Sequence, residues 1–151
     1  MQAPDSLAKN SALFSTVASQ PKPGTVALLS FRMPAGFPSP ANDYIEEGLD
    51  LNCFLVQHKE ASFMFTIEGD SMRDAGILDG DKVIVDRSVT ARHGCIVIAV
   101  VNGDYTVKRL YKRGKRIELH PANPAFDPIT FDAGQELQIW GVVVGSVRRY
   151  V

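Results

Sequence analysis

The chain has 151 residues, of which 45% are hydrophobic and 22% are charged, and its formal net charge is −1. This composition is typical of a globular protein that buries a core without disulfides, and it argues against nucleic-acid binding through overall charge alone. No apolar run is long enough to span a membrane, and the N-terminal residues lack the pattern of a secretory signal, so we expect a cytoplasmic protein. Cys53 and Cys95 show no metal-binding spacing, and we expect free thiols, no metal and no cofactor.

The first 45 residues differ in composition from the rest of the chain, because they are rich in Pro, Ser, Ala and Gly. Such a segment buries too little apolar area to fold by itself. We therefore predict a flexible N-terminal arm over residues 1–45 and a folded core over residues 46–151. One apolar stretch of the arm, Val26–Phe31, is a candidate for docking onto a partner surface.

A short helix and six strands are predicted after the arm. Asp50 is a suitable N-cap for a helix over Leu51–Gln57. Short β-branched or aromatic runs between turn residues predict strands at Ser62–Glu68, Lys82–Asp86, Cys95–Val101, Tyr105–Lys112, Arg116–Leu119 and Leu137–Val147. Asn102–Gly103 predicts a tight hairpin. Strands do not alternate with helices, so the expected fold class is mostly β, with antiparallel strands, hairpins and one or two short helices.

A serine follows the first predicted strand, in the sequence Gly69-Asp70-Ser71-Met72. Gly69 permits a sharp turn, and a serine just past such a turn can present its hydroxyl to a cleft beside free backbone N–H groups. A serine after a strand is more often a turn or cap residue. The pattern alone therefore makes Ser71 a weak candidate nucleophile.

Lys108 lies in the middle of the predicted strand that follows the Asn102–Gly103 turn. Alternation places Lys108 on the same face as Thr106 and Leu110. If that face is buried, desolvation lowers the pKa of the lysine, and the neutral amine can accept the proton of a serine hydroxyl. The pattern alone favours the competing interpretation, in which the amine reaches water.

The stretch from Gly36 to the C-terminus closely resembles the UmuD type of the LexA/UmuD family of self-cleaving Ser–Lys peptidases, and more distantly LexA and phage repressors. The matching motifs are G-F-P-S-P-A-x-D-Y (Gly36–Tyr44), L-D-L-N (Leu49–Asn52), G-D-S-M (Gly69–Met72), D-G-D-x-x-I-V-D (Asp79–Asp86), H-G-x-I-V-I-A (His93–Ala99), T-V-K (Thr106–Lys108) and P-x-N-x-A-x-x-P-I-T (Pro121–Thr130). They occur in the family's order and at similar separations, over about three quarters of the chain.

This resemblance implies a LexA-like peptidase core with a catalytic dyad of Ser71 and Lys108, and a scissile bond between Ala35 and Gly36. It also implies a homodimer and self-cleavage stimulated by RecA filaments on single-stranded DNA. The shortened form is expected to act with an error-prone, UmuC-like Y-family translesion polymerase in SOS mutagenesis. The UmuD type tends to have Cys-Gly at the scissile bond, so the Ala-Gly of this chain matches the LexA-like members instead.

Three other features admit different interpretations. The six basic residues within Lys108–Arg116 suggest a nucleic-acid patch, but such a run is more often the solvated tip of a hairpin, so we expect no direct DNA binding. His93 is a candidate base for a Ser–His–Asp triad, which spacing alone leaves open. An acidic group is too loosely spaced to predict a metal site; it consists of Asp70, Asp74, Asp79 and Asp81.

Two alternative functions remain at this point. A LexA-like transcriptional repressor requires a helix-turn-helix before the cleavage site, whereas only 35 residues precede Gly36 and four prolines interrupt them. In the other alternative the dyad is vestigial, and the fold serves as a non-catalytic polymerase accessory subunit. A leader peptidase shares the dyad by resemblance, but it requires a membrane anchor, which we do not expect here.

Overall fold

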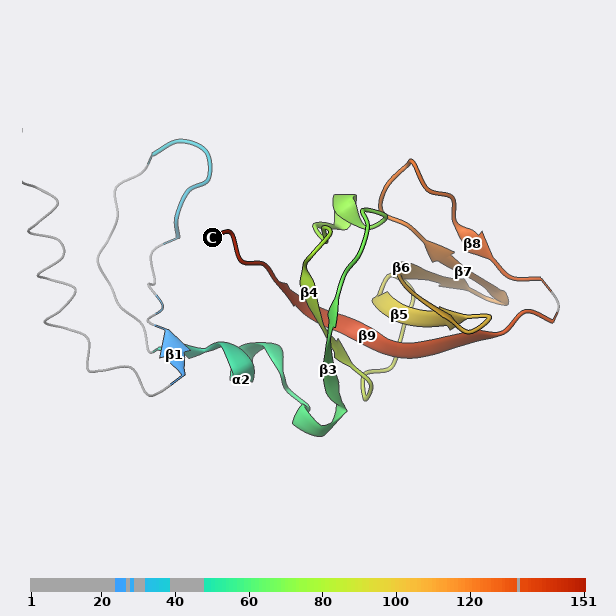
Figure 1. The fold of residues 1–151 in the computed structure, drawn as a ribbon, viewed down its shortest axis with the longest axis horizontal. Helices are drawn as coiled ribbons and strands as arrows, with labels where there is room; N and C mark the ends of the chain where they lie inside the picture. The colour runs from blue at the N-terminus through green and yellow to red at the C-terminus, as the bar shows by residue number, and fades with distance from the viewer. Residues whose placement is uncertain (1–23, 27, 29–31, 39–47, 133) are drawn as a thin grey trace, which may run out of the picture. The chain divides into compact units, whose positions relative to one another are not determined.

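The structure, a computed structural model, describes residues 24–26, 28, 32–38, 48–132 and 134–151 (Figure 1). The chain divides into two compact units, residues 1–54 and 55–151. No helix in the described ranges is long and apolar enough to cross a membrane. The predicted boundary between arm and core, after residue 45, lies outside the described residues and stays a prediction.

The described part of the first unit contains a minimal antiparallel pairing of strands β1 (Thr25–Val26) and β2 (Leu49–Asp50). Helix α2 (Leu51–Leu55) follows at once. Asp50 caps it, because its Oδ1 accepts the backbone N–H groups of Asn52 at 2.9 Å and Cys53 at 3.2 Å. The predicted cap is thus confirmed, and the helix ends two residues before the predicted Gln57. Docking of Val26–Phe31 onto a partner remains a prediction, since several of those residues lie outside the described ranges.

The second unit is built on a seven-stranded antiparallel sheet with the strand order β3-β4-β9-β5-β6-β7-β8. Its strands are β3 (Ser62–Thr66), β4 (Lys82–Asp86), β5 (Ile96–Val101), β6 (Asp104–Arg113), β7 (Arg116–His120), β8 (Ile129–Thr130) and β9 (Leu137–Val147). Two short 3-10 helices, η1 (Lys59–Ala61) and η2 (Arg73–Ala75), flank β3 and β4. The mostly β, antiparallel fold class is confirmed, and so are all six predicted strands, to within two residues at each end.

Strand β9 is an inner strand of the sheet and lies between β4 and β5 (Figure 1). Its register shifts once against each neighbour, beside Val85 of β4 and Ala99 of β5. An added Cβ at Gly141 of β9 would come within 2.6 Å of Val85 Cγ1 on β4. The missing side chain therefore permits close packing of these two strands.

Apolar side chains cover both faces of the sheet, because successive residues of a strand point to opposite sides. In β5, Ile98 joins one buried cluster, and its neighbours Val97 and Ala99 join the other. The first cluster also contains Met72, which is 1% exposed and comes from the loop after β3. Burial of Met72 therefore anchors the loop that carries the preceding residue, Ser71.

Candidate active site

Ser71 and Lys108 meet through a direct hydrogen bond, although they lie 37 residues apart in the chain. Lys108 Nζ donates to Ser71 Oγ at 3.0 Å. Lys108 extends from β6 and is 8% exposed, whereas Ser71 is half-buried in the loop between β3 and β4. The fold thus brings together the two residues for which the sequence suggested nucleophile and base.

The turn before Ser71 depends on Gly69. Its φ of +86° lies in the left-handed region, which glycine adopts without the steric cost of a Cβ. The Gly69 N–H donates to Asp79 Oδ1 at 2.6 Å, which ties the start of the loop to the turn before β4. This geometry confirms the sharp turn that the G-D-S-M motif predicts.

The far side of the same loop is fastened to the segment that follows β7. Ala122 N–H donates to the carbonyl of Ser71 at 2.8 Å. Asn123, which is 5% exposed, donates from Nδ2 to the carbonyl of Asp70 at 3.0 Å. Asn123 therefore helps to hold the nucleophile loop in place. Sequence reasoning assigned it no role, although it is the Asn of the P-x-N motif.

The Lys108 amine is surrounded by three oxygen atoms. Besides Ser71 Oγ, its contacts are Thr106 Oγ1 at 2.8 Å and the Val107 carbonyl at 2.9 Å. Among the described residues no carboxylate lies within ion-pair distance of Lys108. Burial lowers the pKa of Lys108 from its ordinary value, as the predicted desolvation requires. The neutral form of the Lys108 amine is therefore more populated in this site than it would be in water.

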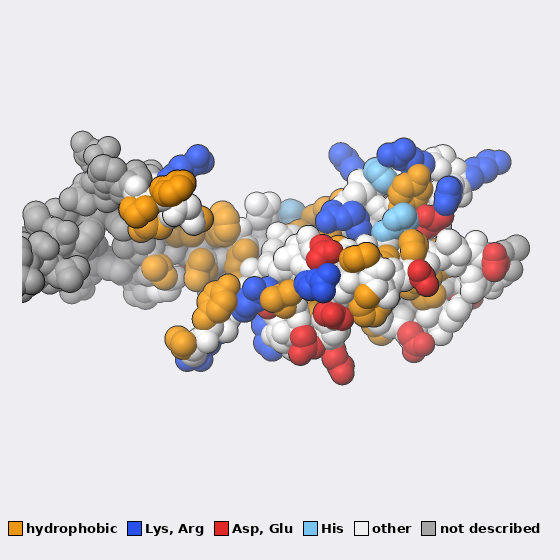
Figure 2. Space-filling model, turned by 90° about the horizontal axis from the view of Figure 1, so that it is seen from above, with side chains coloured by type: hydrophobic (Ala, Val, Ile, Leu, Met, Phe, Trp, Pro, Cys, Tyr) orange, Lys and Arg blue, Asp and Glu red, His pale blue; other side chains and the backbone are white. Residues whose placement is uncertain are grey.

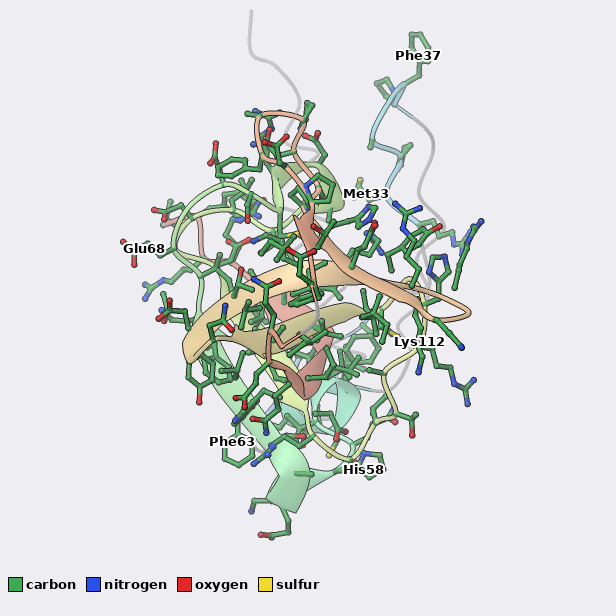
Figure 3. The ribbon with its side chains drawn as sticks, turned by 90° about the vertical axis from the view of Figure 1, so that its right-hand side faces the viewer. Met33, Phe37, His58, Phe63, Glu68 and Lys112 are labelled. Atoms are coloured by element: carbon green, nitrogen blue, oxygen red, sulfur yellow. The ribbon has the colours of Figure 1, made fainter. Side chains whose placement is uncertain are left out.

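A cavity of about 340 Å³ opens in front of this pair. Besides Ser71 and Lys108, its walls come mainly from β3, including Phe65 and Thr66, and from β6, including the exposed Tyr105. Glu68 adds a carboxylate at the rim, and Figure 3 shows its side chain directed outward. Phe65 and Tyr105 were not singled out from the sequence, because an aromatic residue in a strand gives no signal of a binding role.

Ala35 and Gly36, the residues of the predicted scissile bond, belong to the first unit and are both exposed. They lie in a bend within residues 32–38, a stretch without helix or strand. An exposed, irregular backbone is the form in which a peptide bond can enter a cleft. The identity of the scissile bond remains a prediction.

The other candidate residues have different partners. His93 does not line the cavity that contains Ser71; its Nδ1 accepts the backbone N–H of Lys112 at 3.1 Å, and its ring packs edge-on against Tyr111. Within the acidic group, Asp81 forms a bidentate ion pair with Arg148, whose Nε and Nη2 donate to its two carboxylate oxygens. In the part of the chain that the structure describes, no three His, Cys, Asp or Glu side chains are grouped as a metal site requires.

The chain is similar in sequence to several known proteins. The family model for peptidase S24-like proteins matches residues 27–144. Protein SamA of Salmonella typhimurium is 44% identical over 130 residues, which cover 86% of this chain and 90% of SamA. Protein MucA of Escherichia coli is 44% identical over 120 residues, or 79% of this chain and 82% of MucA. The LexA repressor of Syntrophotalea carbinolica is 49% identical over 88 residues, which cover 58% of this chain but only 44% of the repressor.

Proposed function

Since this chain belongs to the peptidase S24-like family, as a member of its UmuD type, we propose that it is a self-cleaving serine peptidase with Ser71 as nucleophile and Lys108 as base. The observation that carries the proposal is the 3.0 Å hydrogen bond between Ser71 Oγ and the buried Lys108 amine. Lys108 is buried, its pKa is lowered, and it makes no ion pair with a carboxylate of the described residues, so its amine is suited to accept a proton.

The proposed reaction has two halves. Ser71 Oγ attacks the Ala35 carbonyl carbon while the neutral Lys108 amine takes the hydroxyl proton. The C–N bond to Gly36 then breaks, and Lys108 returns the proton to the departing Gly36 amine. The same amine then deprotonates a water molecule, which attacks the carbonyl carbon of the Ser71 ester. The C–O bond to Ser71 Oγ breaks, Lys108 returns the proton to Ser71 Oγ, and the new carboxyl group of Ala35 is released. Within the described residues the Ser71 N–H makes no hydrogen bond, and it is therefore available to an oxyanion.

The Ala35–Gly36 bond is the proposed substrate for two reasons. Its two residues are exposed in a segment without regular structure, and both are small enough for close approach to a nucleophile. Cleavage there releases residues 1–35 and leaves a core that starts at Gly36.

The proposed setting is the bacterial DNA-damage response in the cytoplasm. A RecA filament on single-stranded DNA stimulates cleavage by favouring the arm conformation that presents Ala35–Gly36 to the cleft, which is a population shift rather than added chemistry. The chain acts as a homodimer, and its shortened form supports a UmuC-like Y-family polymerase during translesion synthesis. The support for RecA stimulation, the homodimer and the polymerase partner is the chain's membership of the UmuD type.

The decisive experiment is incubation of the purified full-length chain with RecA, single-stranded DNA and a nucleotide, followed by intact-mass measurement. We expect two products, and N-terminal sequencing should start the larger one at Gly36. Ser71→Ala and Lys108→Ala should abolish cleavage, whereas the matched controls Ser146→Ala and Lys59→Ala, at exposed positions, should cleave normally. A folded wild-type chain that never cleaves would instead favour the non-catalytic accessory subunit.

A second substitution tests the bond itself. Gly36→Val places a β-branched side chain next to the scissile carbonyl, and we expect it to slow cleavage sharply without affecting the fold of residues 55–151. Normal cleavage of Gly36→Val, or a larger product that starts elsewhere, would remove Ala35–Gly36 as the target while leaving the dyad in place.

A further inference from the structure

The β6–β7 hairpin extends beyond the strands on both sides of it. The pairing of β5 with β6 ends at Arg109, and the pairing of β7 with β8 begins only at Glu118. Residues 111–117, which contain the turn at Gly114 and Lys115, therefore form a two-stranded ribbon whose strands pair with each other. We refer to residues 111–117 as the ribbon tip.

The ribbon tip concentrates positive charge. Four of its seven residues are basic and none is acidic; the basic ones are Lys112, Arg113, Lys115 and Arg116. The chain as a whole carries −1, so the tip's +4 leaves −5 on the remaining residues. All four side chains are exposed. Figure 2 shows Lys and Arg side chains projecting at one end of the second unit beside His side chains, and Figure 3 shows Lys112 among outward-pointing nitrogen-tipped side chains.

Two of these cations, Arg113 and Arg116, pack against the ring of Tyr111. The guanidinium groups of Arg113 and Arg116 lie 5.5 Å and 5.7 Å from the centroid of its ring, and the His120 ring stacks on it at 4.9 Å. Arg116 is further fixed by the buried carboxylate of Glu118. Positions held in this way lose less entropy when a ligand binds.

Most donors of the ribbon tip are unused. Within the described residues, the side chains of Lys112, Arg113 and Lys115 donate no hydrogen bond to the protein. The tip therefore combines two arginines held against Tyr111 with the free N–H donors of Lys112, Arg113 and Lys115, a combination that suits oxygen anions in a row.

We propose that the ribbon tip binds the phosphate backbone of nucleic acid. An acidic protein partner is the rival ligand, but protein interfaces are usually anchored by a buried aromatic or aliphatic residue. The tip offers little of that kind, since Tyr111 is already covered by its neighbours and Ile117 is only 38% exposed. Phosphate binding requires only the charges, and it carries no sequence preference.

This proposal departs from the expectation, based on composition, that the chain does not bind DNA directly. The net charge of −1 conceals the separation of +4 onto one protruding ribbon. Electrostatic attraction depends on the local charges within about one Debye length rather than on the sum over the chain. The proposal does not involve Ser71 or Lys108, and its test is therefore independent of self-cleavage.

The structure sets the size of the expected effect. Three phosphate contacts, from Lys112, Arg113 and Lys115, predict that log K falls with log salt at a slope of about −2 for a single strand and about −2.7 for a duplex. Raising the salt from about 50 mM to about 200 mM should then weaken single-strand binding roughly 20-fold. Removing these three cations should reduce the slope for a single strand by about 2.

The test is fluorescence anisotropy of the full-length chain with a labelled oligothymidylate, with a duplex of the same length, and with a labelled polyglutamate peptide, each across a salt series. The test variant is Lys112→Gln/Arg113→Gln/Lys115→Gln, which keeps Arg116 beside Glu118. The matched control is Lys59→Gln/Lys82→Gln/Arg149→Gln, which removes the same charge at other exposed positions. Far-UV circular dichroism and thermal melts establish that both variants fold.

Each outcome decides the proposal. Binding of either nucleic acid by the wild type, with the expected slope in the control and a slope reduced by about 2 in the tip variant, supports it; the relative affinity of strand and duplex then identifies the form. Equal losses in the two variants would place the binding elsewhere. Tighter binding of polyglutamate than of oligothymidylate would assign the tip to an acidic protein. Absence of nucleic-acid binding at low salt would overturn the proposal.

Discussion

Replacing Thr106 by valine removes one of the three oxygen atoms around the Lys108 amine and keeps a β-branched side chain on β6. The neutral amine has two N–H groups and one lone pair. If the N–H groups donate to Thr106 Oγ1 and the Val107 carbonyl, the lone pair is left for the Ser71 hydroxyl. Thr106 is therefore a positioning residue that acts through Lys108.

The size of the effect follows from the single hydrogen bond that is lost. A bond between neutral groups contributes about 0.5–1.5 kcal/mol, and a factor of ten in rate corresponds to about 1.4 kcal/mol. We therefore expect Thr106→Val to lower the maximal rate of self-cleavage roughly 2- to 12-fold. Because Thr106 Oγ1 accepts more strongly from an ammonium than from an amine, its loss should also lower the pKa of Lys108 further.

The assay is the first-order rate of self-cleavage of the full-length chain without RecA, measured from neutral pH to about pH 10.5. Wild-type cleavage should rise with pH through the lowered pKa of Lys108 and then level off. Thr106→Val should level off at a lower rate and at a lower pH, whereas Thr106→Ser, which keeps the hydroxyl, should follow the wild type. An unchanged profile for Thr106→Val, or an equal loss in Thr106→Ser, would refute the positioning role.

Three further predictions concern stability. Because burial lowers the pKa of Lys108, the unfolded chain binds more protons between the two pKa values, and the wild type should gain stability relative to Lys108→Met as the pH rises toward about 10.5; parallel melts with a constant gap would contradict this. Gly141→Ala should destabilise by about 1–3 kcal/mol in urea titrations, because its Cβ would approach Val85 Cγ1 within 2.6 Å; an unchanged urea midpoint would show that the sheet relaxes freely. The pKa of the buried Asp81 is lowered to about 2, chiefly by its hydrogen bonds from Arg148, so this pair stabilises the fold above about pH 4 and the benefit is lost as the pH falls toward 2. Arg148→Gln should raise the midpoint of acid unfolding followed by circular dichroism, and an unmoved midpoint would show that Asp81 finds another partner.

Local patterns were sufficient for most of the fold because the relevant forces act between near neighbours. Asp50 caps α2 through N–H groups two and three residues away, and Asn102 turns the β5–β6 hairpin with a φ of +48°. Strands β1, β2 and β8 are only two residues long, and their pairing depends on distant partners. No pattern of alternation can reveal a strand of that length.

The candidate site shows the same limit. Whether Lys108 is desolvated depends on what covers its face of β6, and the pattern alone favoured an exposed amine. The fold decides otherwise, because Lys108 is only 8% exposed and its amine lies within hydrogen-bond distance of the Ser71 hydroxyl. Strand alternation could predict that Thr106 lies beside Lys108, because it is two residues earlier on the same strand. Asn123 was not, since its role depends on a carbonyl 53 residues away.

The position of β9 between β4 and β5 determines when the sheet of a newly made chain can be completed. Strands β4 and β5 pair with β9 and not with each other, yet residues 137–147 leave the ribosome after all the other strands. The half that holds the Ser71 loop and the half that holds Lys108 therefore have no shared strand until β9 has been synthesised. Such late, long-range closure is a slow folding step. We therefore expect the proposed cleavage of the Ala35–Gly36 bond to begin only after β9 has been inserted between β4 and β5.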